Sequence, residues 1–194
     1  MARRYEMSAR ERARAATREE ILDAAVELFG PAWFDEVTLA DVAKRAGVSQ
    51  QTVVNHFGSK IDLYLTAIGE RVAPRLAAAR AGVTPGDVDA IVACVVRDYE
   101  ESGDGNIRIV ALAGRLAELR EVLRRGRAWH RAWVEEVFAP QLARRRGATR
   151  ERVLTLLVTV LDVTTWKTLR RDEGLDPKQT ELHLKALVEG VLAA

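Results

Sequence analysis

Cysteine and long apolar runs are scarce in this 194-residue sequence. The single cysteine, Cys94, excludes an intrachain disulfide and is typical of a protein from a reducing compartment. No apolar run approaches the roughly 18 residues that a membrane-spanning helix needs. The basic amino terminus also lacks the apolar segment of a secretory signal peptide. We therefore expect a soluble, cytoplasmic protein that does not interact with a membrane.

The sequence also lacks the patterns of catalytic and metal sites. Its three histidines are dispersed, and no combination of His, Cys and carboxylate residues has a metal-ligand spacing. No Gly-rich phosphate loop or nucleophile motif is present. These absences predict a protein without cofactor, metal ion or enzymatic activity, and they leave an enzyme built on a helical bundle as a disfavoured class.

Positive charge is concentrated at the amino terminus. The whole chain carries a formal net charge of +2, which is too small to indicate nucleic-acid binding by itself. Residues 1–18, however, contain six arginines and two glutamates, a net charge of +4. A basic arm over residues 1–16 could follow DNA phosphates or enter a minor groove, and a solvated tail is the equal alternative.

Apolar residues recur at helical spacing throughout, and no period-2 alternation marks a strand. We predict an all-α fold of about nine helices, with a loop at Gly103, Asp104 and Gly105. Pro74 is expected to kink the fourth helix, and Asp176 to open the last. The predicted helices cover residues 17–29 (or from residue 8), 38–47, 49–57, 59–80, 85–102, 106 to 114 or 115, 116–145 and 149–166, and a last helix starts at residue 176 and includes residues 182–192.

The most informative stretch is residues 38–60, TLADVAKRAGVSQQTVVNHFGSK. Thr38 is placed to cap a short helix, with Asp41 completing a capping box. Gly47 provides the left-handed turn that ends this helix, and Ser49 caps the next one. The pattern is that of a helix-turn-helix, although an ordinary three-helix corner with a polar surface would share its glycine and caps.

The second helix of this motif presents neutral hydrogen-bonding side chains opposite its buried face. Gln and Asn pair bidentately with adenine edges in the major groove, so this face is suited to reading bases. Lys60 lies in the first turn of the following helix, where a cation is unfavourable unless a partner such as a phosphate compensates it. We predict base or adjacent backbone contacts for Gln50, Gln51, Thr52 and Asn55, and phosphate contacts for Thr38, His56 and Lys60.

Residues 17–65, including TREEILDAAVELF and FDEVTLADVAKRAGVSQQTVVNHFGSKIDL, resemble the TetR family of bacterial transcriptional repressors. Two residues depart from the family pattern: Val54 replaces an aromatic residue, usually Tyr, and Trp33 replaces a common Gly. The resemblance implies a helix-turn-helix DNA-binding domain over residues 17–65 and a helical regulatory and dimerisation domain over residues 66–194. It further implies a homodimer that binds a near-palindromic operator and is released by a small effector. A constitutive or architectural DNA-binding protein is the alternative.

The carboxy-terminal half offers candidate ligand and dimer residues. Trp and other apolar side chains with a few polar groups are typical of small-molecule sites, although Trp at helical spacing is more often core. For an apolar or aromatic ligand we select Ile68, Val72, Cys94, Trp129, His130, Trp133, Asp162 and Trp166. The segment VLTLLVTVLDVTTW is apolar on more than one face, which predicts a dimer interface. The selected interface residues are Leu154, Leu157, Leu161, Leu184, Leu187 and Val191.

Overall fold

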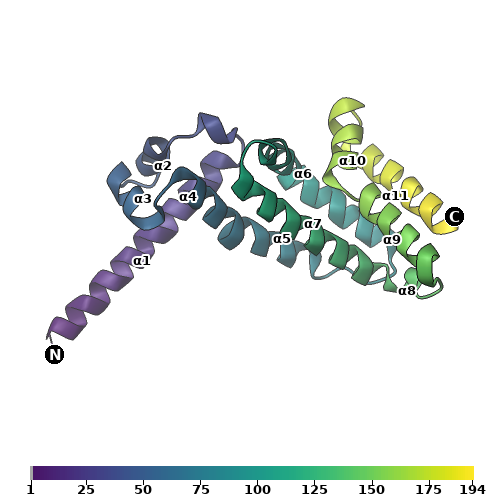
Figure 1. Cartoon of the computed structure of the whole chain (residues 1–194), viewed down its shortest axis with the longest axis horizontal. Coiled ribbons are helices and arrows are strands. Elements are labelled where there is room, and N and C mark those ends of the chain that lie inside the picture. The colour runs from purple at the N-terminus through teal and green to yellow at the C-terminus, as the bar shows by residue number, and fades with distance from the viewer. Residues whose placement is uncertain (1) are drawn as a thin grey trace. The chain divides into compact units, whose positions relative to one another are not determined.

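The computed structural model describes residues 2–194, with side chains from residue 9 onward. No β-strand occurs in this part of the chain, which confirms the predicted all-α fold class. The helices form two compact units, of which the first ends at Leu76 and the second comprises residues 77–194 (Figure 1). The division predicted from the sequence was after residue 65. Among the described helices, none combines the length and apolarity needed to cross a membrane.

The first unit is built on one long helix. This helix, α1, covers Ala2–Phe29 and therefore begins before either of the starts predicted from the sequence. Gly30 and Pro31 follow it, and proline cannot continue a helix. The remaining elements of the unit are η1 (Phe34–Glu36), α2 (Leu39–Arg45), α3 (Gln50–Phe57), α4 (Lys60–Ala67) and η2 (Ile68–Val72).

An apolar stripe on α1 packs against α2 and α4 and forms the core of this unit. Ile21, Leu22 and Ala25 of that stripe are fully buried. At the end of α1, the ring of Phe29 lies 5.9 Å from that of Phe34 and 4.9 Å from that of Tyr64, measured between centroids. This aromatic cluster fixes the loop after α1 against α4.

The helix predicted over residues 59–80 is interrupted just before Pro74. There α4 gives way to the π turn η2, and the N–H of Ala73 donates to the carbonyl of Ile68, five residues earlier. The helix α5, Ala73–Arg80, follows directly. Proline has no N–H and its ring clashes with the preceding α-helical turn, so a locally widened turn accommodates it. The disturbance expected from Pro74 therefore takes the form of a π turn.

The second unit is organised around α6, Val88–Ala113, against which α7, α10 and α11 pack. Its core consists of aliphatic and aromatic side chains from these helices and α9. After α6, the elements of this unit in chain order are α7 (Ala117–Val137), α8 (Ala139–Leu142), α9 (Gly147–Val160), α10 (Val163–Lys167), η3 (Thr168–Asp172) and α11 (Pro177–Ala193).

The predicted loop at residues 103–105 is wrong, because α6 runs through it without a break. Gly103 is needed there for packing and not for a turn. A Cβ atom on Gly103 would lie 2.4 Å from Cζ3 of Trp166, so only glycine leaves room for the indole ring. The ring is fully buried, and its Nε1 donates to Oε1 of Glu100 at 2.9 Å. This close contact between α6 and α10 explains the glycine.

Two further helix boundaries differ from those predicted. The long helix expected over residues 116–145 ends at Val137, and Pro140 lies in the short α8. The helix expected over residues 149–166 is divided by Asp162, whose carboxylate accepts hydrogen bonds from the backbone N–H and hydroxyl of Thr164 and caps α10. The predicted start of the last helix is confirmed, because Asp176 and Gln179 form a capping box at α11.

Candidate nucleic-acid interface

The helix-turn-helix forms with the caps that its sequence predicts. Thr38 is the N-cap of α2, and its hydroxyl accepts from the backbone N–H of Asp41 at 3.1 Å. In return the Asp41 carboxylate accepts from the backbone N–H of Thr38 at 2.9 Å, so the capping box is complete. The Thr38 hydroxyl also donates to the Asp41 carboxylate at 2.5 Å, and this hydrogen bond, together with the one from the Thr38 N–H, lowers the pKa of Asp41. The hydroxyl of Thr38, predicted to contact phosphate, already bonds to Asp41, and the phosphate contact remains a prediction.

The turn between α2 and α3 is a Schellman motif. Gly47 has a φ of +70°, which is the left-handed conformation expected of this glycine. The N–H of Gly47 donates to the carbonyl of Lys44 at 3.3 Å, and the N–H of Val48 donates to that of Ala43 at 3.0 Å. Ser49 then caps α3 by accepting from the N–H of Thr52 at 3.1 Å. The angle between the two helices is thus set by local hydrogen bonds.

The exposed face of α3 carries a hydrogen-bonded pair of amides. Gln51 Nε2 donates to Oδ1 of Asn55 at 3.0 Å, across one turn of the helix. Both side chains are exposed, as is that of Gln50. The pair leaves the carbonyl oxygen of Gln51 as an acceptor and the amide group of Asn55 as a donor. These are the two functions that recognise adenine through its N6 and N7 atoms. Thr52 is less available, because its hydroxyl lies 2.8 Å from that of Ser49 within the cap.

Lys60 has partners within the protein. Its Nζ donates to the carbonyl of Phe34 at 2.6 Å and to that of Val37 at 2.7 Å. The same ammonium lies 4.2 Å from the centroid of the Phe34 ring, a cation–π contact. These contacts compensate the unfavourable position of a cation at the start of α4, a role that the sequence pattern had suggested for a DNA phosphate. The phosphate contact of Lys60 remains a prediction and would have to use its third donor.

His56 lies beside α1, near the carboxy-terminal end of α3. Partial burial lowers its pKa below the usual 6.5, and the positive charges of Arg14 and Arg18 on α1 lower it further. The imidazole is therefore neutral at pH 7 and has one N–H to donate. Its predicted phosphate contact is untested, but the arginines place positive charge from α1 close to α3.

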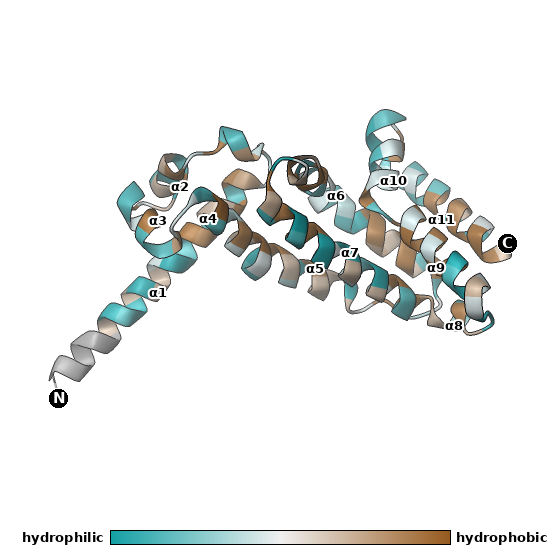
Figure 2. Cartoon of the chain, in the orientation of Figure 1, coloured by the Kyte–Doolittle hydropathy of each residue, from teal (hydrophilic) through white to brown (hydrophobic). Residues whose placement is uncertain are grey.

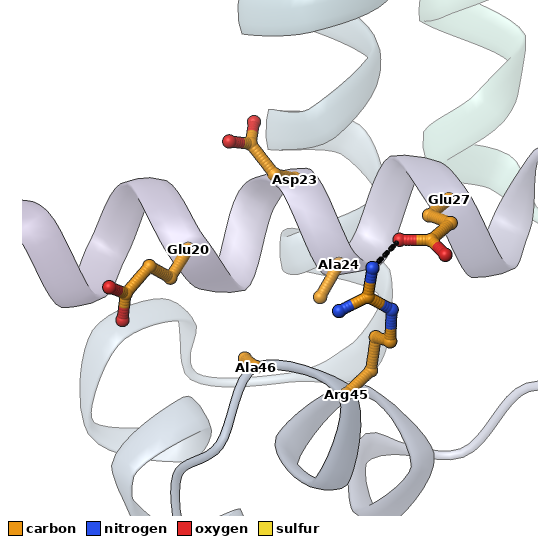
Figure 3. A pocket seen from close by; sticks show the side chains of 6 residues that line it. All are labelled: Glu20, Asp23, Ala24, Glu27, Arg45 and Ala46. Atoms are coloured by element: carbon orange, nitrogen blue, oxygen red, sulfur yellow. Dashed lines mark ion pairs between the residues drawn. The ribbon is translucent and has the colours of Figure 1, made fainter.

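A negatively charged surface, in contrast to the positive charge beside α3, lies between α1 and the end of α2. A shallow pocket of about 220 Å³ is lined by Glu20, Asp23 and Glu27 of α1 together with Arg45 and its neighbours (Figure 3). Arg45 forms an ion pair with Glu27 at 2.6 Å. Asp23 is paired with Arg71, and Glu20 and Glu27 still outnumber Arg45, so this side of α1 is negative and unsuited to DNA phosphates.

The candidate ligand residues are distributed over both units. Ile68 and Val72 lie in η2 of the first unit. In the second unit Trp166 packs against Gly103, and Asp162 caps α10. Three of the remaining four candidates share contacts with one buried arginine, Arg80, which was not selected from the sequence.

Arg80 is 3% exposed and is the only residue of α5 that is buried. Its Nε and Nη2 both donate to Oδ2 of Asp98 on α6, the former at 3.1 Å. Its Nη1 lies 3.1 Å from Nδ1 of His130. The rings of Trp133 and Trp129 surround the guanidinium, with centroids at 4.7 and 5.2 Å from its central carbon. Cys94 touches the same end of α5, because its thiol contacts the carbonyl of Ala79 at 3.6 Å.

The arrangement determines the protonation of His130. Nδ1 faces an arginine donor and must accept, so the ring is neutral with its proton on Nε2. Burial and the charge of Arg80 lower the pKa of His130 to about 4. Unfolding restores a value near 6.5, so the unfolded chain binds this proton at a higher pH.

We therefore expect the free energy of unfolding to fall as the pH drops from 6.5 to about 4. His130 contributes about 2 to 3 kcal/mol to this fall, since a pKa difference of one corresponds to about 1.36 kcal/mol. Urea titrations at several pH values check this, with His130→Gln as the control that should flatten this part of the profile. An unchanged profile in that variant would contradict the assignment.

The candidate dimer residues need one correction. Leu154, Leu157, Leu161 and Leu184 are all buried inside the chain's own core, at 0 or 1% exposure. These leucines are therefore not available for a partner chain, because α9 packs on both α7 and α11. Of the selected residues, Leu187 remains 44% exposed and Val191 is half-buried. Two leucines that were not selected, Leu156 and Leu182, are also exposed, at 41% and 60%.

Among the described side chains, no group of three or more His, Cys, Asp or Glu residues lies close enough together to hold a metal ion.

Comparison with known proteins identifies the helix-turn-helix. Residues 21–67 match the sequence profile of bacterial regulatory proteins of the tetR family. The chain is 44% identical over 50 residues to the HTH-type transcriptional regulator AlkX of Mycobacterium tuberculosis, an alignment that covers 26% of this chain and 24% of AlkX. It is 34% identical over 74 residues to the uncharacterized HTH-type transcriptional regulator TtgW of Pseudomonas putida, covering 38% of this chain and 52% of TtgW.

These alignments span about a quarter and about half of the two relatives. The similarity of fold covers more of the chain than these sequence alignments do. A transcriptional regulator from Rhodococcus sp. Rha1 superimposes with a TM-score of 0.73 at 19% identity, over 91% of this chain and 96% of that one. Residues 21–67, which match the tetR-family profile, contain α2, the Schellman turn, α3 and α4. With its helix-turn-helix formed as described, the segment of residues 21–67 is similar to the DNA-binding region of bacterial regulatory proteins of the tetR family.

Proposed function

We propose that this protein is a cytoplasmic transcriptional repressor that binds a near-palindromic DNA operator as a homodimer. The observation that carries the proposal is the exposed Gln51–Asn55 pair on a fully capped recognition helix. Neutral amides held in a fixed orientation are suited to base edges, whereas a merely solvated helix face needs no such pairing. The names of the curated relatives, both HTH-type transcriptional regulators, support the same conclusion.

Selection of bound duplexes from a random pool tests this proposal directly. A regulator of this kind should enrich a two-fold symmetric site, with half-sites about one helical turn apart because each protomer contributes one recognition helix. The failure of the wild-type protein to enrich any sequence would overturn the proposal.

On the selected site, Gln51→Ala and Asn55→Ala should each weaken binding by about 1 to 3 kcal/mol and relax the preference at one base pair. The double variant should lose less than the sum of the two, because the side chains bond to each other and act as one unit. Fluorescence anisotropy with the site and its single-base variants measures both quantities.

Lys60→Ala is the comparison for this experiment. Neither support of the loop nor a phosphate contact carries base information, so this variant should weaken all sequences alike. If the two amide variants bind with unchanged affinity and preference, the assignment of the recognition face is wrong.

The homodimer is supported by apolar side chains that the chain leaves exposed. Leu156 on α9 and Leu182 and Leu187 on α11 are exposed, and these two helices pack against each other. Exposed leucines gathered on neighbouring helices are typical of a protein interface. We place the symmetric contact on α9 and α11, with Leu156 and Leu182 added to the residues selected from the sequence.

Release by a small apolar or aromatic effector is supported by the aromatic surroundings of Arg80 in the second unit. Such an effector acts only by preferring the conformation that does not bind DNA. A constitutive DNA-binding protein is the alternative. A thermal-shift screen with apolar and aromatic compounds, followed by operator-release measurements on the compounds that bind, separates the two.

A further inference from the structure

The first described part of α1 forms an exposed basic helix. The helix is continuous from Ala2, and every described residue from Ala9 to Ala16 is exposed. This stretch contains Arg10, Arg12 and Arg14 and a single acidic residue, Glu11. The acidic residues that line the pocket described above lie nearer the carboxy-terminal end of α1. Figure 2 shows hydrophilic turns along the amino-terminal half of α1, after its grey segment. Charge is therefore segregated along this helix.

Three arginines share one side of the helix. Arg10, Arg14 and Arg18 are spaced four residues apart, and such residues are neighbours on an α-helix. Arg12 is two residues from both Arg10 and Arg14 and so points to another side. Neither Arg10 nor Arg14 forms an ion pair with another described residue, whereas Arg18 pairs with Glu70 at 2.6 Å.

Contacts of Arg18 place this row of arginines beside the recognition helix. The guanidinium of Arg18 lies 5.4 Å from the ring centroid of Phe57, the last residue of α3. Arg14 is close enough to α3 for its charge to help lower the pKa of His56, together with burial and Arg18. Arg18 thus fixes α1 against the end of α3, and Arg10 and Arg14 continue the same positive side.

We propose that Arg10 and Arg14 bind the DNA backbone next to the major groove that α3 enters, so that the first turns of α1 form a helical phosphate-binding extension. This inference rests on the proposed function and goes beyond it, because it adds a contact surface outside the helix-turn-helix. An acidic protein partner would also match the charge. We favour DNA because the row of arginines adjoins α3 and lies on a different side of α1 from the acidic pocket.

The test compares Arg14→Gln with Arg12→Gln. Both variants lose one positive charge from the same stretch of α1, but from different sides of the helix. Affinity for the selected site is measured by anisotropy at salt concentrations from about 50 to 300 mM. A phosphate contact contributes about one unit to the slope of log affinity against log salt, or roughly fivefold in affinity near 0.15 M salt. We expect this loss in Arg14→Gln, equally on specific and random DNA, and an unchanged slope in Arg12→Gln.

Circular dichroism of both variants should match the wild type, because glutamine is nearly as good a helix former as arginine. Equal slopes for the two variants would mean that the arginines act only through net charge, and the inference would be overturned while operator binding by the wild type stood. Failure of the wild-type protein to bind any DNA would instead defeat the proposed function. Hydroxyl-radical footprinting gives an independent readout: protection of phosphates beside the half-site should weaken in Arg10→Gln/Arg14→Gln.

Discussion

Replacing Asp98 by alanine should lower the free energy of unfolding by about 3 to 5 kcal/mol, because it leaves the guanidinium of Arg80 buried without its counter-ion. Arg80 is 3% exposed, so water cannot replace the lost carboxylate. His130 offers no compensation, since its neutral ring can accept only one of the five N–H groups. Chemical denaturation followed by circular dichroism measures the loss.

Asp104→Ala is the matched control, on the same helix. Asp104 also pairs with an arginine, Arg171, through two hydrogen bonds at 2.9 and 3.0 Å. Its side chain is 51% exposed, however, and exposed pairs contribute less than about 1 kcal/mol. In a second comparison, Arg80→Met with Asp98→Leu removes both charges and should be close to neutral. Equal losses for Asp98→Ala and Asp104→Ala would show that burial does not govern the pair.

The position of Arg80 gives this pair a consequence for the proposed regulation. All the other residues of α5 are at least partly exposed, and its last side chain, Arg80, bonds to both α6 and α7. α5 continues directly from η2 and α4 of the DNA-binding unit. Under the proposed function, an effector that enters beside Trp129 or Trp133 would compete with the guanidinium of Arg80. Displacement of Arg80 would release α5 from α6 and α7. Because α5 is continuous with η2 and α4, this release would affect the DNA-binding unit.

The features that the sequence predicted correctly are decided by neighbouring residues. The caps at Thr38, Ser49 and Asp176 and the left-handed turn at Gly47 each depend on side chains within three or four positions. Such hydrogen bonds join residues that are close in the sequence, so they can be predicted from the sequence alone. The helix-turn-helix was predictable for this reason.

The features that the sequence did not reveal concern residues with distant partners. Gly103 follows the usual sign of a loop, but Trp166, 63 positions away in the sequence, requires a glycine within a helix. Lys60 has its partners in the loop before α2, and Arg80 has them on α6 and α7. No local pattern records these pairings. The exposed leucines could not be predicted either, because α9 is apolar on several sides and only its neighbours decide which side is covered.

Replacing a leucine by arginine should have different effects at an exposed position and at a buried one. Leu182→Arg should leave the fold intact, because the side chain is 60% exposed and surface changes usually stay within about 0.5 kcal/mol. It should nevertheless dissociate the proposed dimer. A two-fold interface contains the substitution twice, and two losses of about 2 kcal/mol raise the dissociation constant about a thousandfold. Sedimentation velocity at micromolar concentration should then show a helical monomer.

Leu157→Arg is the matched variant on α9. Leu157 is fully buried in the chain's own core, so an arginine there removes packing worth about 2 to 5 kcal/mol and adds an unpaired buried charge. This destabilisation approaches or exceeds the total stability of many domains. We therefore expect an unfolded chain with reduced helicity, and not a folded monomer. Operator binding should vanish in both variants, but only Leu182→Arg should keep its thermal unfolding transition. A dimer that persists in Leu182→Arg and in Leu187→Arg would place the interface elsewhere on the chain.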